Sequence, residues 1–369
     1  MKLSEITSII TDYVANGSFA SLRENAKYVS KEKGYARVIR LTDENNHYSL
    51  EDAIFVNYES YCFLSKSKLD SGDIIVTNVG AYLGTVFQCP NLNIPMTLGP
   101  NAILIKPNNL VINKYLYYLL NSNYGHRKLL SLISGSAMPK FNKTDLKNLN
   151  ISIHNKSLQH HIVNTIGSVD NLIENLTKQN EILMTLGISK INQFNNSYEK
   201  KSLNKIVKFE KGFEVGSSKY IEIYKKGLIN YLRVGDLLSL SNTYIDEKDS
   251  DKIAKFEDIL VAFDGSPGRN SIGLVGAYSS GIYNLKSTNN DKGLVYFEMN
   301  SDINKKIIDN HSQGTTILHA SKSINYLVYV DVDDNDKKVL NNYFYLILQN
   351  KKKINFLNKI KDNLLNKYF

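Results

Sequence analysis

The feature that most constrains this chain is that it repeats itself. The stretch SGDIIVTNVG (residues 71–80) returns 185 residues later as FEDILVAFDG (256–265), and both contain an acidic residue, three apolar residues and a following glycine. Internal similarity over a long period indicates that one structural unit is used more than once. The sequence therefore predicts two related folding units, each built around the same strand and turn.

Further pairs of segments keep the same order along the chain. GYARVIRLTDE (34–44) matches GLINYLRVGDL (227–237), and SGSAMPKFNKTDL (134–146) matches QGTTILHASKSIN (313–325). The distance between partners falls from 200 residues at the two starts through 193 and 185 to 179. Small loop deletions would leave such a drift, whereas chance matches would not preserve the order. We interpret the repeat as a tandem duplication.

A heptad pattern follows each copy. Between residues 158 and 186 apolar side chains recur every seven positions, and the same spacing returns 178 residues later. Heptad spacing predicts a long helix whose apolar seam needs a partner, and the simplest partner is the other helix packed antiparallel. About 30 residues would form a rod of ~45 Å, with Gly187 as a candidate C-cap. The seam residues are Ile162, Val169, Leu176, Leu183, Leu340, Ile347 and Ile354.

These patterns predict an α+β fold. Two strand-rich globules would be separated and followed by long helices that pack as an antiparallel coiled coil. Asn350 and Lys361 interrupt the second seam, and polar seam residues tend to fix helix register. The expected boundaries are residues 1–153 for the first globule, 154–198 for the central helical spacer, 199–332 for the second globule and 333–369 for the distal helix.

Composition favours a polyanionic partner. The 45 lysines and arginines exceed the 36 acidic residues, which gives a formal net charge of +9. The two cysteines, Cys62 and Cys89, are too few for a disulfide framework, so we expect buried thiols in a reducing compartment. No apolar run approaches the ~18 residues of a membrane span, and the first residues do not resemble a signal peptide. We expect a cytoplasmic protein.

Several enzyme classes lack their characteristic residues here. The glycine clusters VGAYLG and DGSPGRNSIG are not followed by the Lys-Ser/Thr of a phosphate-binding loop, and we interpret them as tight turns. The Asn/Asp-Pro-Pro-aromatic loop of a DNA amino-methyltransferase is also missing. His160 and His161 are adjacent on a predicted helix and cannot chelate a metal together. We predict no catalytic residues and no metal site.

Basic residues and tyrosines occur together at equivalent places in both copies. A solvated surface would also explain them, but cations beside aromatic rings suit contacts with DNA phosphates and bases. Arg40 and Arg233, in the doubled Arg-x-x-Asp element, are instead interpreted as members of internal ion pairs. The candidate DNA-binding residues are Arg23, Lys27, Lys31, Lys33, Arg37, Lys211, Lys219, Lys225, Lys226 and Arg269.

The whole chain resembles the DNA-specificity subunits of type I restriction-modification systems. The resemblance rests on the two globules alternating with long helices, on RLTD and RVGD, on GDIIV and EDILV with their glycine turns, and on SGSAMPKFNKTDL. The second copy departs from this pattern with QGTTILHASKSIN, and the final helix reaches Phe369 without a long tail, which leaves partner contacts at that end undefined.

The resemblance implies a function beyond what spacing predicts. Each globule would be a target-recognition domain that reads one half of a bipartite, asymmetric site in double-stranded DNA. The helices, including their seam residues, would fix the spacer and bind two methyltransferase subunits, and motor-nuclease subunits could join the complex. The chain itself would bind no cofactor, while S-adenosylmethionine, ATP and Mg²⁺ would belong to its partners.

Two other classes of function stay open at this point. A self-contained restriction endonuclease would need a carboxylate–lysine metal site, for which the only candidate is the acidic stretch YIDEKDSDK (244–252). A methyltransferase-associated specificity module of another restriction class is the alternative within restriction-modification systems. A purely structural coiled-coil scaffold would account for the helices but not for two basic globules.

Overall fold

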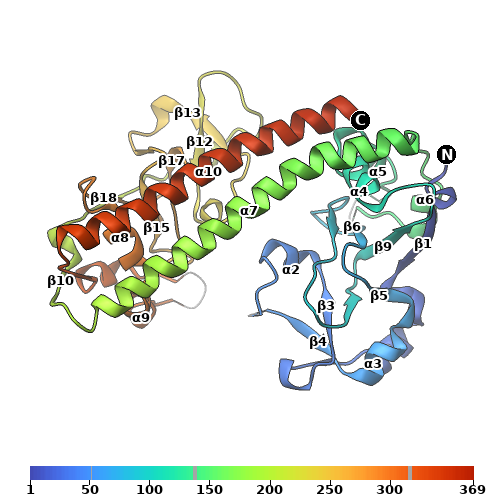
Figure 1. The fold of residues 1–369 in the computed structure, drawn as a ribbon, viewed down its shortest axis with the longest axis horizontal. Coiled ribbons are helices and arrows are strands. Elements are labelled where there is room, and N and C mark those ends of the chain that lie inside the picture. Colours follow the sequence, from blue (N-terminus) through green and yellow to red (C-terminus); the bar gives the residue numbers. More distant parts are fainter. Residues whose placement is uncertain (51, 136–138, 315–317) are drawn as a thin grey trace. The chain divides into compact units, whose positions relative to one another are not determined.

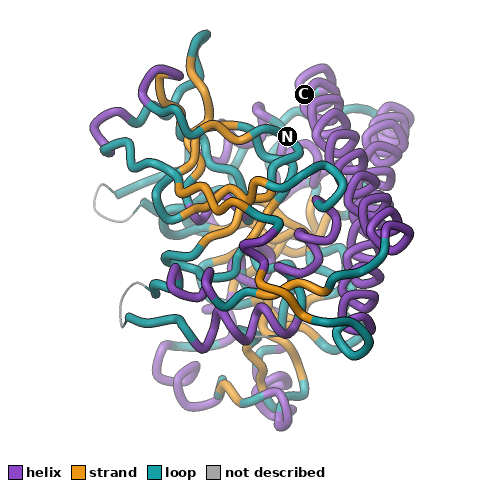
Figure 2. Tube along the Cα trace, turned by 90° about the vertical axis from the view of Figure 1, so that its left-hand side faces the viewer, coloured by secondary structure: helices purple, strands orange, loops and turns teal. Residues whose placement is uncertain are grey.

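The computed structural model describes residues 1–50, 52–135, 139–314 and 318–369, so parts of two repeat segments lie outside the described residues (Figure 1). The chain divides into two compact units. The first consists of Met1–Asn171 and Lys359–Phe369, and the second of Leu172–Asn358. Both units mix helices and strands, which confirms the predicted α+β class (Figure 2).

The first unit contains two sheets. One has the order β1-β9-β6-β7 and is antiparallel throughout. The other has the order β2-β4-β3-β8-β5, in which β3 and β8 run parallel. The strands are β1 (Thr7–Asp12), β2 (Tyr28–Val29), β3 (Ala36–Ile39), β4 (Ile54–Val56), β5 (Lys68–Leu69), β6 (Ile74–Thr77), β7 (Val86–Gln88), β8 (Met96–Leu98) and β9 (Ala102–Pro107).

Short helices complete the first globule. Its main core lies between the β1-β9-β6-β7 sheet and helix α4, whose Tyr115, Leu116 and Leu119 are fully buried. The helices are α1 (Phe19–Asn25), α2 (Leu41–Asn45), α3 (Tyr58–Phe63), α4 (Asn113–Asn121), α5 (Asn123–Leu130) and α6 (Lys143–Lys147).

The second unit repeats this plan. Its four-stranded sheets have the orders β11-β18-β15-β16 and β13-β12-β17-β14, and β12 and β17 are again a parallel pair. A short ladder joins β10 (Lys200–Ser202) to β19 (Val328–Val330). The remaining elements are β11 (Lys208–Lys211), β12 (Leu228–Leu232), β13 (Tyr244–Asp246), β14 (Ile253–Ala254), β15 (Ile259–Ala262), β16 (Asn270–Ser271), β17 (Gly276–Tyr278), β18 (Ile282–Lys286), α8 (Lys292–Met299) and α9 (Asp302–Asn310).

The two units are structural equivalents. Strands β1, β9, β6 and β7 occupy the same sheet positions as β11, β18, β15 and β16, and the parallel pair β3–β8 corresponds to β12–β17. The main-chain hydrogen bond from Leu3 N to Leu149 O returns as Leu203 N to Leu327 O, at 2.9 Å in both. The duplication predicted from the sequence is therefore confirmed in the fold.

Two long helices, α7 (Lys156–Phe194) and α10 (Asp334–Tyr368), follow the globules in the chain, and they pack together (Figure 1). In the second unit, Lys190 Nζ lies 2.9 Å from Asp336 Oδ1, and Asn350 Nδ2 donates to Asn180 Oδ1 at 3.0 Å. Residue numbers rise on one helix as they fall on the other, so the predicted antiparallel packing is confirmed.

The first unit contains the other ends of the same two helices, also antiparallel. Lys361 Nζ lies 2.7 Å from Asp170 Oδ1, and His161 Nε2 is 3.1 Å from the Tyr368 hydroxyl. Asn350 and Lys361, the two polar residues of the second seam, thus each have a polar partner on α7. Such paired groups favour one register, because a shifted helix would leave them without partners.

The sequence suggested that Gly187 ends the first long helix, but it does not. Helix α7 has 39 residues and continues to Phe194, which corresponds to about 58 Å at 1.5 Å per residue. Gly187 is buried instead, and a Cβ there would lie 2.2 Å from the ring of Phe297 on α8. The glycine is needed for close packing between α7 and α8, and not for a C-cap.

Candidate nucleic-acid interface

The acidic residue that opens each repeat is a structural group. Asp73 Oδ2 accepts a hydrogen bond from the Asp70 amide at 2.7 Å and lies 2.9 Å from Lys106 Nζ on the neighbouring strand β9. Burial raises the pKa of Asp73, and the Asp70 amide and Lys106 oppose that rise. The carboxylate therefore ties the turn before β6 to the adjacent strand.

Asp258 performs the same task in the second unit. Its Oδ2 accepts from the Lys255 amide at 3.0 Å and lies 2.8 Å from Lys286 Nζ on β18. Asn284 adds a third hydrogen bond at 2.7 Å. Burial favours a raised pKa, but these donors outweigh it, so the pKa of Asp258 lies below its usual value. This part of the repeat serves the fold and is not a DNA-reading group.

The doubled Arg-x-x-Asp element forms an internal ion pair in the first unit, as predicted. Arg40 Nε lies 2.8 Å from Asp43 Oδ2, and the same carboxylate accepts from the Arg40 amide. In the second unit the pair is looser. Arg233 Nε is 3.8 Å from Asp236, and its guanidinium also donates to Thr243 Oγ1 at 3.1 Å. Both arginines stabilise the turn that follows a central strand of their sheet.

Arg37 does not belong in the predicted set of DNA-binding residues. It lies on the central strand β3 and is only 2% exposed. Its guanidinium is 3.3 Å from Asp43 Oδ1 and donates to the carbonyl oxygens of Tyr48 and Ser49 at 2.9 and 2.8 Å. A guanidinium enclosed in this way has its donors directed into the protein and does not reach a DNA phosphate, so the prediction for Arg37 is wrong.

The other basic residues of the first cluster are exposed. They lie on α1, on the short helix Lys31–Lys33 and on the segment between these elements. Tyr28 and Tyr35 are also exposed, and Tyr35 packs against Tyr58 with ring centroids 4.9 Å apart. The structure thus places cations beside accessible aromatic faces in the first unit. These cations are Arg23, Lys27, Lys31 and Lys33.

The second unit has a comparable surface. The four lysines predicted to bind DNA there, Lys211, Lys219, Lys225 and Lys226, are all exposed. Lys219 is paired with Asp249 at 2.7 Å, which reduces the charge that it offers to a phosphate. The exposed Tyr224 ring contacts Tyr244 with centroids 5.4 Å apart. Lys225 and Lys226 therefore stand next to an aromatic pair, as the cations of the first unit do.

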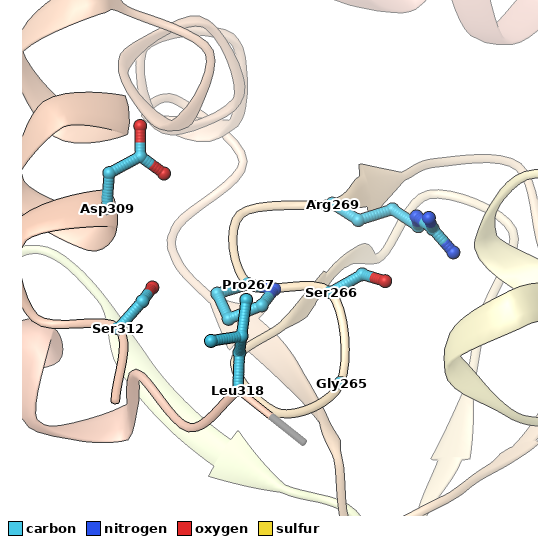
Figure 3. A pocket seen from close by; sticks show the side chains of 7 residues that line it. All are labelled: Gly265, Ser266, Pro267, Arg269, Asp309, Ser312 and Leu318. Atoms are coloured by element: carbon cyan, nitrogen blue, oxygen red, sulfur yellow. The ribbon is translucent and has the colours of Figure 1, made fainter. Parts of the chain in front are cut away.

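Arg269 lies in the glycine-rich turn after β15. Its Nη1 is 3.5 Å from the Val234 carbonyl oxygen, at the limit of a hydrogen bond. The turn borders a hollow of about 510 Å³ lined by Gly265, Ser266, Pro267, Arg269, Asp309, Ser312 and Leu318. Figure 3 shows the Arg269 side chain pointing away from Asp309. Among the described residues, this bond to Val234 occupies one of the several N–H donors of the guanidinium.

The heptad residues are divided between the two globular cores. Ile162 and Val169 are buried in the first unit, and Leu340 and Ile347 in the second, so these four side chains are not available to a partner subunit. The sequence predicted a helix–helix and subunit interface, and this burial is contrary to the subunit part for these four residues. The helix–helix part agrees with the packing, because Leu340 and Ile347 share one core with Leu183 of α7, and Ile162 shares the other with Leu365 of α10. The remaining heptad residues, Leu176, Leu183 and Ile354, are half-buried.

Exposed apolar residues occur elsewhere on the same helices. Leu172, Ile182 and Leu186 on α7, and Leu346 and Phe356 on α10, are each at least 45% exposed. The seven-residue period alone does not identify these residues as interface candidates. The sequence does contain a sign of them: several large apolar residues lie outside the heptad positions, and a helix packed only within its own chain would not expose so many of them.

The chain is similar to known proteins in sequence and in structure. Residues 10–184 match the type I restriction modification DNA specificity domain. The chain is 32% identical over 117 residues to the type I restriction enzyme MjaIX specificity subunit of Methanocaldococcus jannaschii. That alignment covers 32% of this chain and 26% of the relative, so the chain spans about a quarter of the relative's length.

Two solved structures are similar along the whole chain. The S subunit of the type I restriction-modification system from M. genitalium has 18% identity and a TM-score of 0.48, with 100% of this chain and 95% of that chain covered. The HsdS subunit from Thermoanaerobacter tengcongensis has 13% identity and a TM-score of 0.37, with the same two coverages. Among the described residues, no helix is both long and apolar enough to cross a membrane.

Proposed function

We propose that the whole chain is the DNA-recognition subunit of a type I restriction-modification complex, as the match of residues 10–184 to the type I restriction modification DNA specificity domain supports. The observation that carries this proposal is the duplicated fold. The second unit repeats the sheet orders of the first apart from the edge strand β2, so we extend the function of one copy to the other.

Each unit would read one half of a bipartite DNA site. Two reader domains on one chain resemble the two subunits of a dimer, which bind two half-sites at a fixed spacing. The surfaces of the two units differ in sequence, with Arg23 and Lys27 in one and Lys225 and Arg269 in the other. Two different readers recognise an asymmetric site, whereas two identical readers would recognise a palindrome.

The long helices would set the spacer and bind two methyltransferase subunits. Support comes from the apolar residues that they expose, Leu172, Ile182, Leu186, Leu346 and Phe356. Apolar side chains of this size gain free energy when a partner removes them from water, at about 25 cal/mol per Å². The paired polar groups in the seam would hold the two helices in one register while a partner binds.

The chemistry would belong to the partners. In this proposal the chain itself is not an enzyme, and it directs methyltransferase subunits that carry S-adenosylmethionine. Motor-nuclease subunits, which use ATP and Mg²⁺, could join the same complex in the cytoplasm. What this chain contributes is the choice of the DNA sequence at which the partners act.

The proposal is tested by purification from the native cell and by methylation mapping. A tagged chain should bring methyltransferase subunits with it, and deletion of its gene should abolish adenine methylation at one bipartite motif. An unchanged methylome and the absence of co-purifying methyltransferase would contradict the proposal. Mg²⁺-dependent DNA cleavage by the isolated chain would instead identify a self-contained endonuclease.

Arg269 provides a residue-level test of the same proposal. Arginine recognises guanine through two hydrogen bonds, and one such contact contributes about 1–3 kcal/mol of discrimination. Arg269→Ala should therefore relax one base position in one half of the methylated motif. Lys225→Ala, at an exposed lysine of the same unit, should weaken binding without changing the motif. Equal relaxation in both halves would contradict the assignment of Arg269 to one half-site.

A further inference from the structure

A junction between a glycine turn and a second loop occurs in both units with the same main-chain hydrogen bonds. In the first unit, Gly80 N donates to Pro139 O at 3.5 Å, and Phe141 N donates to Asn78 O at 3.2 Å. The glycine has a φ of +95°, which favours this residue over any other. The turn that follows β6 is therefore fastened to the loop that precedes α6.

The second unit repeats these contacts with different side chains. Gly265 N donates to Leu318 O at 2.8 Å, and Ala320 N donates to Phe263 O at 2.7 Å. Gly265 also has a positive φ, +77°. The partners are 185 residues apart on the turn and 179 apart on the loop, as the sequence repeat predicts.

Two further main-chain bonds close the loop in each unit. Ser134 and Lys140 exchange hydrogen bonds of 2.9 and 3.2 Å, and Gln313 and His319 exchange bonds of 3.0 and 2.8 Å. Lys140 and His319 therefore hold the same position in the two copies. Since main-chain atoms make all these contacts, neither side chain is required to hold the junction together.

Both side chains are exposed, and both have N–H groups that can donate to a phosphate. Lys140 is exposed, and the His319 side chain is 61% exposed with its Nδ1 2.8 Å from Asp264 Oδ1. The contact with Asp264 orients the imidazole and leaves Nε2 on the other side of the ring. The corresponding turn residue in the first unit, Val79, is apolar, so Lys140 has no equivalent carboxylate beside it.

We propose that Lys140 and His319 are equivalent DNA-phosphate contacts, one in each unit. This inference rests on the proposed function and adds the residues that position each reader on the duplex. Phosphate contacts fix register and orientation without reading sequence, so the same contact can serve both halves of an asymmetric site. A side chain that can donate a hydrogen bond from the same main-chain position in both units, while its neighbours change, has the features of such a contact.

In the second unit the junction also adjoins the Arg269 turn. Leu318, next to His319, lines the hollow that Arg269 borders (Figure 3). A phosphate held by His319 would bring the adjacent nucleotides toward that turn. In that arrangement His319 would bind the DNA backbone and Arg269 would contact a base edge.

The test uses the full chain and two duplexes, one with the methylated motif and one with that motif scrambled. Lys140→Gln and His319→Gln should each weaken binding to both duplexes by about 3- to 10-fold, because each removes one phosphate contact. The slope of log K against log salt should become shallower by up to about 0.9 for Lys140→Gln, which removes a positive charge. His319→Lys keeps a donor to the phosphate and should preserve the affinity for both duplexes, and the methylated motif should stay unchanged in all variants.

The control is Lys178→Gln on α7, where the lysine is exposed and pairs with Glu174 on the same helix. This variant should leave the affinity and the salt slope unchanged. An unchanged salt slope in Lys140→Gln, or an unchanged affinity in His319→Gln, would overturn the inference, as would a change at one base position of the motif. If the unaltered chain binds neither duplex, the proposed function itself fails, which separates the two outcomes.

Discussion

Replacing Arg37 should cost folding stability and not DNA recognition directly. Arg37→Met keeps a long apolar side chain but removes a guanidinium that donates to the Tyr48 and Ser49 carbonyls and lies 3.3 Å from Asp43. Loss of a buried donor costs about 1–3 kcal/mol for each acceptor that is left without a replacement. Asp43 keeps its contact with Arg40 at 2.8 Å, which limits the loss. We expect the free energy of unfolding to fall by about 2–4 kcal/mol.

Urea unfolding of the full chain measures this effect, with Arg23→Met as the matched control. Arg23 is exposed on α1, and its replacement should change the free energy of unfolding by at most about 0.5 kcal/mol. In DNA binding the order should reverse, because Arg23→Met should reduce the salt slope and folded Arg37→Met should not. A stability loss below about 1 kcal/mol for Arg37→Met, together with a reduced salt slope, would refute this reasoning.

Two further changes test the core of the second unit. Glu298 is fully buried on α8, and burial raises its pKa to about 7, so the folded chain binds a proton between about pH 4.5 and 7 that the unfolded chain releases. The free energy of unfolding should therefore fall as the pH rises through that window, by up to about 3 kcal/mol. Glu298→Gln should make the unfolding temperature less dependent on pH between pH 4 and 8. An equal pH dependence in the variant and the unaltered chain would contradict the assignment. Gly187→Ala should destabilise the protein by about 1–3 kcal/mol, because the new Cβ would lie 2.2 Å from Phe297. Gly167→Ala on the same helix is the control: its Cβ meets no atom closer than 3.8 Å, and it should stabilise the protein by up to about 1 kcal/mol. Stabilisation by both changes would show that Phe297 does not pack as described.

The repeat was the part of the fold most accessible from sequence. Equivalent positions drift by a few residues between the copies, and the sheet orders and turn contacts follow the same drift. The heptads likewise predicted two long helices that pack antiparallel. The parallel pairing of β3 with β8 had no such signal, since pairing across distant segments depends on packing of the whole unit and not on local pattern.

Individual side chains were harder to assign. Arg37 and Arg23 belong to the same basic cluster in sequence, but β3 carries Arg37 into the interior, while α1 leaves Arg23 in solvent. The period of seven identified apolar positions but could not show that Ile162 and Leu340 pack into globular cores. Gly187 appeared to be a cap because glycine suits both helix ends and close helix packing, and only the position of the Phe297 ring separates these uses.

The most direct test of the central claim, that each unit reads one half of a bipartite site, is methylome mapping of a chimera. In this chain residues 199–332 are replaced by a second copy of residues 1–153, so both positions carry the first globule. The methylated motif should become an inverted repeat of one half-site of the unaltered chain, because two identical readers recognise a palindrome. A motif that keeps the original second half would contradict the account.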